Sequence, residues 1–141
     1  MKNTDKDMRN YVKAKRVDNG EWVEGFLTRM WQQYHIISAE NENTAYPVDA
    51  DTICHCIGIC DLAEKKMYEY DIVKHYNDFR FPEKFETGII IWNQDRMRYE
   101  ICRLPDLKES YLIFAEYLYE TAGSSLDHPE LKEAISTTVI L

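Results

Sequence analysis

The residue types best suited to chemistry gather in one short segment, Cys54-His55-Cys56, which is followed by Cys60. Thiolates and imidazoles are common zinc ligands, so these side chains are candidate ligands. Alternate residues of a β-strand face opposite sides, however, so Cys54 and Cys56 would point one way and His55 the other. The C-x-C-x3-C spacing also differs from the C-x2-C pattern of zinc knuckles. Buried thiols that pack as small apolar side chains are the favoured interpretation, with no metal and no cofactor predicted.

Two carboxylates, Glu69 and Asp71, fall on the same side of a predicted strand and could act as an acid and base pair. Hydrogen bonds from the amides of the preceding turn to Asp71 are the simpler interpretation. His35, His75 and His128 are scattered, and their spacing supports no catalytic triad. The sequence therefore predicts no catalytic residue and leaves open whether the protein is an enzyme.

The charge balance argues against a nucleic-acid partner. The chain carries 25 acidic and 17 basic residues, which gives a net charge of −8. Such a balance repels phosphate backbones, whose binding requires clustered lysines and arginines. The one basic cluster, formed by Lys13, Lys15 and Arg16, is short.

Hydropathy argues against a membrane partner. The longest apolar runs, such as 89–92, are far below the roughly 20 residues that a membrane-spanning helix needs. The N-terminal segment is polar and lacks the apolar core of a secretory signal. We therefore expect a cytoplasmic protein in which all the cysteines, Cys102 included, are free thiols.

A β-hairpin is the clearest predicted element that could position side chains. Asn19-Gly20 separates two strand-like segments, 11–17 and 21–27, and this dipeptide favours a two-residue hairpin turn. That turn would place Val17 opposite Trp22 and Lys15 opposite Glu24. The pattern predicts an N-terminal hairpin with this register.

The rest of the chain is also rich in strand patterns. Further strands are expected over 34–38, 46–48, 52–57, 71–76, 88–92 and 97–102. Gly58 should end or bend the 52–57 strand, and residues 77–86 should form a loop. With 141 residues and 45% apolar content, the chain is predicted to be a single, mainly β domain.

Two C-terminal segments complete the prediction. Residues 106–119 fit both a helical and a strand pattern, and the pattern alone leaves that choice open. Residues 129–135 are predicted to form a short helix, with Asp127 placed to cap it and Pro129 in its first turn. We thus expect an α+β variant of a mainly β fold.

The segment from Thr52 to Val73 resembles the signature of the YopX family of phage and prophage proteins, T-V-G-x-Y-T-G-L-x-D-x-N-G-x-x-I-Y-E-G-D-I-V. The identical positions are Thr52, Gly58, Asp61, Tyr68, Glu69, Asp71, Ile72 and Val73. The hairpin 19–25 and the C-terminal segments 119–124 and 127–131 resemble other elements of that family. Tyr119 to Ala122 would then be a strand, which favours β structure for 106–119.

The resemblance also shows departures from the family pattern. Cys54, Glu64 and Tyr70 stand where the pattern has glycine. If those family glycines adopt positive φ, a side chain there strains the backbone. The chain therefore resembles a distant member of the family, and we expect local turns of different shape.

The resemblance implies a phage-encoded accessory protein of the bacterial cytoplasm that self-associates and has no established reaction. It implies one YopX-like domain over 1–141, with 1–9 flexible, and gives Thr52, Gly58, Asp61, Tyr68, Glu69 and Asp71 structural roles. The strands from Asp71 onward further suggest a small SH3-like barrel, which is a hypothesis about fold alone.

A possible interface lies at Trp31 and Tyr34, near a predicted loop where large aromatics are hard to bury. Packing beneath the loop is the alternative.

Three functions follow as hypotheses. The first is a self-associating module that binds a phage or host protein. The second is a ligand-binding protein or enzyme with a site formed across subunits, and the third is a nucleic-acid-related role.

Overall fold

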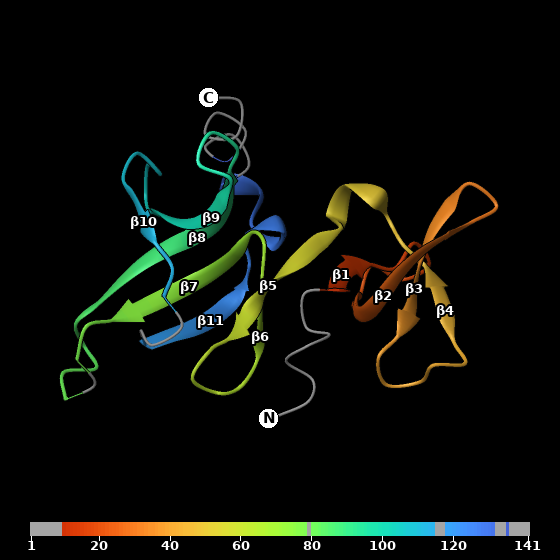
Figure 1. Ribbon diagram of the computed structural model, residues 1–141, viewed down its shortest axis with the longest axis horizontal. Helices are drawn as coiled ribbons and strands as arrows, with labels where there is room; N and C mark the ends of the chain where they lie inside the picture. The colour runs from red at the N-terminus through yellow and green to blue at the C-terminus, as the bar shows by residue number, and fades with distance from the viewer. Residues whose placement is uncertain (1–9, 79, 115–117, 132–134, 136–141) are drawn as a thin grey trace. The chain divides into compact units, whose positions relative to one another are not determined.

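The computed structural model describes residues 10–78, 80–114, 118–131 and 135 (Figure 1). Residues 1–9, which we expect to be flexible, lie outside this range. The described residues are mainly β, as predicted, and their strands form antiparallel sheets. The chain divides into two compact units, Met1–Gly58 and Ile59–Leu141. The prediction that 1–141 form one domain stays a prediction.

The first unit is a curved antiparallel sheet. Its strands are β1 (Tyr11–Lys15), β2 (Trp22–Met30), β3 (Gln33–Ser38), β4 (Ala45–Pro47) and the first part of β5 (Cys54–Cys60). They lie in the order β4-β3-β2-β1-β5, with the short 3-10 helix η2 (Ala50–Thr52) before β5. The strands expected at 34–38, 46–48 and 52–57 are thus present, with ends that differ by up to three residues. Gly58, with φ of 95°, bends β5 without ending it.

Alternation along these strands builds the core of the first unit. Val12, Ala14, Ile36 and Val48 are buried together, and Leu27 packs against them. The backbones also approach closely beside them, since a Cβ atom at Gly25 would collide with the carbonyl oxygen of Ile37. A side chain at position 25 would therefore force β2 and β3 apart.

Residues 47–49 join the end of β1 to the start of β3. Val17 N donates to Pro47 O at 3.0 Å, and Asp49 N donates to Lys15 O at 2.9 Å. On the other side, Val48 N donates to Tyr34 O at 3.0 Å. These bonds hold β1 and β3 at one end of the unit, although β2 separates them in the sheet.

The first hairpin is present, but its predicted register is wrong by two residues. Lys15, not Val17, lies opposite Trp22, and Lys13 lies opposite Glu24. A wider turn replaces the two-residue turn, because Arg16 O accepts a hydrogen bond from Gly20 N and Val17 pairs with residue 47. A shift by two residues keeps every side chain on its predicted side of the sheet.

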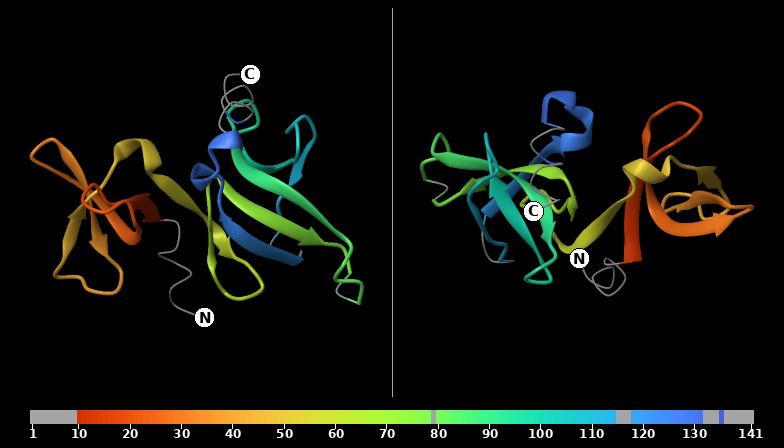
Figure 2. Two further views of the ribbon diagram at one scale, coloured as in Figure 1. Left: turned by 180° about the vertical axis from the view of Figure 1, so that it is seen from behind. Right: turned by 90° about the horizontal axis from the view of Figure 1, so that it is seen from above.

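The second unit is built on a five-stranded antiparallel sheet. Its strands are β7 (Asp71–Tyr76), β8 (Phe85–Asn93), β9 (Arg98–Arg103), β10 (Ser110–Leu112) and β11 (Leu118–Ser124). Their order is β10-β9-β8-β7-β11, so β11 lies beside β7, the first strand of the sheet (Figure 2). The short strand β6 (Lys66–Tyr68) precedes β7, and two 3-10 turns, η3 (Ser125–Asp127) and η4 (Pro129–Leu131), follow β11.

Both faces of this sheet are covered. Ile72, Ile89, Ile91, Cys102, Leu107 and Ile135 form a buried cluster on one face. Val73, Ile90 and Ile101 alternate with these residues along the strands and are also buried, as is Tyr119 of β11. This double burial explains the apolar run Ile89–Trp92 of β8.

Most expectations for the second unit hold. The strands at 71–76 and 88–92 are present, and the ambiguous segment 106–119 contains β10 and the first two residues of β11, while 115–117 lie outside the described residues. Met97 was predicted to begin the strand 97–102, but it lies in the β8–β9 turn. It has φ of 55°, and 66% of its surface is exposed.

Two finer expectations are not confirmed. Of the helix expected over 129–135, the structure describes the 3-10 turn η4 and a helical residue at Ile135, while 132–134 lie outside the described residues. Among the described strands, neither sheet closes into a barrel. The mainly β class is therefore confirmed, while the helix over 129–135 stays a prediction.

Candidate binding site at the β2–β3 turn

The β2–β3 turn carries the most exposed large apolar side chain in the described chain. Trp31 and Gln32 occupy the turn with φ of 56° and 65°, the backbone of a type I′ turn. Glycine and asparagine favour that conformation, and other side chains strain it. The indole of Trp31 is 93% exposed. The strained backbone thus presents an aromatic ring to solvent.

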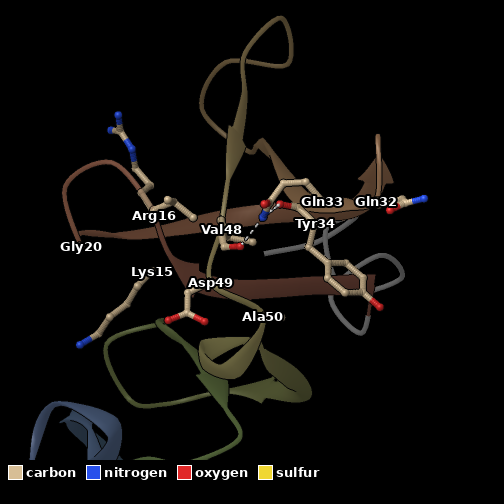
Figure 3. Close-up of a pocket in the computed structure, with 10 residues that line it drawn as sticks. Lys15, Arg16, Gly20, Gln32, Gln33, Tyr34, Val48, Asp49 and Ala50 are labelled. Atoms are coloured by element: carbon tan, nitrogen blue, oxygen red, sulfur yellow. Dashed lines mark hydrogen bonds between the residues drawn. The ribbon is translucent and has the colours of Figure 1, made fainter.

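A pocket of about 670 Å³ lies close to this turn, where the end of β1, the start of β3 and residues 48–50 meet. Lys15 and Arg16 flank it on one side and Tyr34 on the other, with Asp49 between them (Figure 3). Its complete lining is Lys15, Arg16, Val17, Gly20, Gln32, Gln33, Tyr34, Val48, Asp49 and Ala50. The pocket exists because residues 47–49 bridge two strands.

Hydrogen bonds hold the polar wall of the pocket in place. Gln33 Nε2 donates to Val48 O at 2.9 Å and to Tyr34 O at 3.1 Å, as the dashed lines in Figure 3 show. Asp49 accepts a bond from Asp51 N at 3.0 Å and so caps η2. These bonds preorganise the wall, which reduces the ordering that a ligand must impose.

The basic wall is also fixed. The guanidinium of Arg16 lies 4.1 Å from the ring centre of Tyr46 and donates to Asp18 at 2.6 Å. The hydrogen bond from Arg16 lowers the pKa of Asp18, and that carboxylate raises the pKa of Arg16. Val17, 61% exposed, adds an apolar surface beside this pair. The pocket thus combines cationic and apolar walls.

Basic and aromatic side chains also gather on one face of β1 and β2. The ammonium groups of Lys13 and Lys15 lie 4.9 and 5.4 Å from the ring centre of Trp22. Next to them, Tyr11 and Phe26 form an edge-to-face pair with ring centres 4.7 Å apart. This face gathers most of the short basic cluster.

Asp61, one of the expected structural residues, is nearly buried and fixes the β5–β6 turn. Its carboxylate accepts bonds from Ala63 N and Lys65 N at 2.8 and 2.9 Å. It also accepts bonds from both the backbone N and the hydroxyl of Thr121. Burial alone would raise the pKa of Asp61, but these donors lower it. The hydrogen bonds of Asp61 thus indicate that its carboxylate stabilises the fold.

The other signature residues also lie in turns and strands. Asp71 Oδ2 accepts a bond from Tyr68 N at 2.9 Å, which is the turn bond expected of it. Thr52 Oγ1 accepts a bond from Lys15 N at 2.8 Å. Glu69 lies half-buried in the β6–β7 turn and Gly58 in β5. They do not converge on the pocket.

The cysteine segment alternates as predicted. Cys54 and Cys56 are buried, His55 is exposed, and Cys60 is half-buried. Cys54 Sγ donates to Thr52 O at 3.4 Å. Within the described part of the chain, no three His, Cys, Asp or Glu side chains are grouped as metal ligands.

A buried polar cluster in the second unit was not predicted from the sequence. The ring of His75 lies 5.5 Å from that of Tyr111 and 5.1 Å from that of Tyr119. Burial lowers the pKa of His75, while Glu86 opposes that shift, and burial raises the pKa of Tyr111 to about 12. Arg103 stacks over Tyr111 and pairs with Glu86. These residues come from five different strands, so no local spacing could reveal them.

Glu100 is a second buried group that was not predicted. Its carboxylate accepts bonds from Asn93, Arg96, Arg98 and Ser110. Burial would raise the pKa of Glu100, but these donors lower it to about 2. The carboxylate ties the β8–β9 hairpin to β10 and acts as a structural anion.

Comparison with protein families, curated proteins and solved structures gives no match for this chain. Among the described residues, no helix has the length and apolar character to cross a membrane.

Proposed function

We propose that this protein is a non-enzymatic, phage- or prophage-encoded accessory protein of the bacterial cytoplasm that self-associates and binds protein through the β2–β3 turn. The observation that carries the proposal is the 93% exposure of Trp31 at that turn. Tryptophan is among the side chains most enriched at the energetic centres of protein interfaces. A binding role explains why so large an apolar ring is left in water.

The backbone at the turn supports the same proposal. Trp31 and Gln32 both adopt positive φ, which costs on the order of 1–3 kcal/mol for a residue other than glycine. Such strain persists mainly where function requires it. Asn-Gly would relieve the strain, but it would remove the indole.

We also propose that the protein is YopX-like and that its second unit is SH3-like, and two features support this. Glu64 and Tyr70 have φ of 62° and 70°, at two positions where the family pattern has glycine. In the second unit, β7 to β10 form a meander and β11 returns to pair with β7. This strand order is the one we expect for a small SH3-like barrel.

The experiment that tests the proposal compares Trp31→Ala with Met97→Ala by sedimentation velocity over a range of protein concentrations. Met97 is the matched control, because it is also an exposed apolar residue with positive φ in a hairpin turn. We expect the wild type and M97A to associate alike, and W31A to dissociate at least about tenfold more readily.

Two results would count against the proposal. A wild-type protein that stays monomeric at every concentration would remove self-association. Equal association of W31A and the wild type would show that the turn is not the contact.

A nucleic-acid role is the second candidate, because Lys13 and Lys15 flank Trp22 on one sheet face. Stacked aromatics with nearby cations are the usual surface for single-stranded nucleic acid. Fluorescence anisotropy with a labelled oligonucleotide tests it. Binding that weakens steeply with salt in the wild type, and is lost in Trp22→Ala, would favour this role.

A further inference from the structure

The pocket beside the β2–β3 turn has walls that can accept an aromatic ring such as the indole of Trp31. We propose that two copies of this chain exchange their Trp31 indoles, each ring entering the pocket of the other copy. This inference rests on the proposed self-association and specifies its contact. It commits to a second copy of the chain as the occupant of the pocket.

The sequence places the inserted ring and its receptor side by side. Gln32 lines the pocket, and Trp31 is the residue before it. A two-fold axis beside the turn would therefore bring each ring to the partner's pocket in one interface. Such isologous contacts use the same patch on both copies and close at two subunits.

The size and walls of the pocket suit an indole. A volume of about 670 Å³ is ample for one aromatic side chain. Val17 and Ala50 supply apolar wall for the ring. The cations of Lys15 and Arg16 already lie over Trp22 and Tyr46 of their own chain, so the apolar wall carries this contact.

The pocket also offers an acceptor for the indole N–H, which usually finds a hydrogen-bond partner when buried. Asp49 accepts one bond through Oδ1, from the backbone of Asp51. A carboxylate has room for several donors, so its other oxygen can accept the indole N–H. Asp49 is the one acidic residue in the described lining.

Charge gives this contact a distinct salt dependence. Each copy carries a formal net charge of −8, so two copies repel one another at long range. Salt screens that repulsion, whereas the insertion of the ring is mainly apolar. We therefore expect association to strengthen with salt, opposite to the behaviour of nucleic-acid binding.

The test uses two variants alone and mixed. Trp31→Ala removes the ring, and Ala50→Trp fills the pocket from an exposed position on η2. Each variant alone should dissociate at least about tenfold more readily than the wild type. An equimolar mixture should form a heterodimer, because the W31A copy keeps an open pocket and the A50W copy keeps its ring. Native mass spectrometry separates the three possible dimers by mass.

The outcomes distinguish this inference from the proposed function. If W31A weakens association and A50W does not, the turn is a contact but the pocket is not its receptor, and the exchange is overturned. If neither variant changes association, both proposals fail. If both variants weaken it but their mixture forms no heterodimer, the exchange is overturned as well.

A second measurement does not depend on the folding of A50W. N-acetyltryptophanamide is titrated into W31A and followed by amide NMR. Shifts confined to the pocket, at Gln32, Gln33 and Ala50, would support an indole-binding pocket. If even the highest concentration of N-acetyltryptophanamide shifts no signal, the indole-binding pocket is overturned. Shifts spread over the second unit would overturn it as well.

Discussion

Asp61 and Thr121, 60 residues apart in sequence, are joined by two hydrogen bonds to a single carboxylate oxygen. Thr121 donates to Asp61 Oδ2 through its backbone N at 3.0 Å and through its hydroxyl at 2.9 Å. The same carboxylate holds the β5–β6 turn through its other oxygen. One side chain therefore attaches that turn to β11.

Asp61→Ala should be strongly destabilising. The change leaves buried amides of the turn and of Thr121 without their acceptor, at a cost of roughly 2–4 kcal/mol in the free energy of unfolding. Urea unfolding followed by fluorescence measures it. Asp95→Ala, in an exposed turn, is the control and should change stability by less than about 0.5 kcal/mol. Similar effects of the two changes would show that the Asp61 network is dispensable.

Glu100→Gln should remove an acid-sensitive part of the stability. The pKa of Glu100 is lowered from 4.5 to about 2, so its ionised form stabilises the fold above pH 4.5, and that contribution is lost as the pH falls towards 2. At neutral pH the variant should be less stable by up to about 3 kcal/mol. The difference in unfolding free energy between the wild type and E100Q should shrink as the pH falls from 4.5 towards 2. A difference that is constant with pH would contradict the assignment.

His75→Gln should change the response to mild acid. The pKa of His75 is lowered from 6.5, mainly because burial disfavours the imidazolium. Its contribution to stability is therefore fully present above pH 6.5 and is lost as the pH falls through the folded-state pKa. Thermal melts of the wild type should drop more steeply below pH 6.5 than those of H75Q. Parallel curves would show that His75 does not titrate in this way.

Glu64→Gly should stabilise the protein. Glu64 is exposed and has φ of 62°, a conformation that glycine adopts without steric cost. We expect a gain of about 1 kcal/mol in the free energy of unfolding, which denaturant titration can detect. Glu83→Gly, in an exposed loop position without positive φ, is the control and should not stabilise. If E64G were less stable than the wild type, the positive φ at Glu64 would not be a source of strain.

Local sequence patterns were sufficient for most of the strands. The 71–76 segment was predicted with its observed bounds, because the polar segment with Pro82 that follows it indicates where the strand ends. Glu64 and Tyr70 both adopt positive φ, whereas the turns there were expected from the sequence to change shape. The turn bond to Asp71 could also be predicted, because its donor, Tyr68 N, lies only three residues earlier in the sequence.

Features that depend on distant residues were missed. The hairpin register failed because Val17 pairs with Pro47, a partner outside the local turn. The environments of His75 and Glu100 are created by neighbouring strands, and the sequence does not show which strands will be neighbours. The pocket has the same origin, since Lys15, Tyr34 and Asp49 meet only through strand pairing.

The bridge formed by residues 47–49 has a consequence for the order of folding. The β2–β3 hairpin is local and can form early, whereas the bonds from Val48 and Asp49 to Tyr34 and Lys15 close longer loops at a greater entropic cost. During synthesis, the Trp31 indole would thus be exposed on the β2–β3 hairpin before the pocket has formed. If the proposed exchange of indoles occurs, only a fully folded molecule could accept a partner's ring.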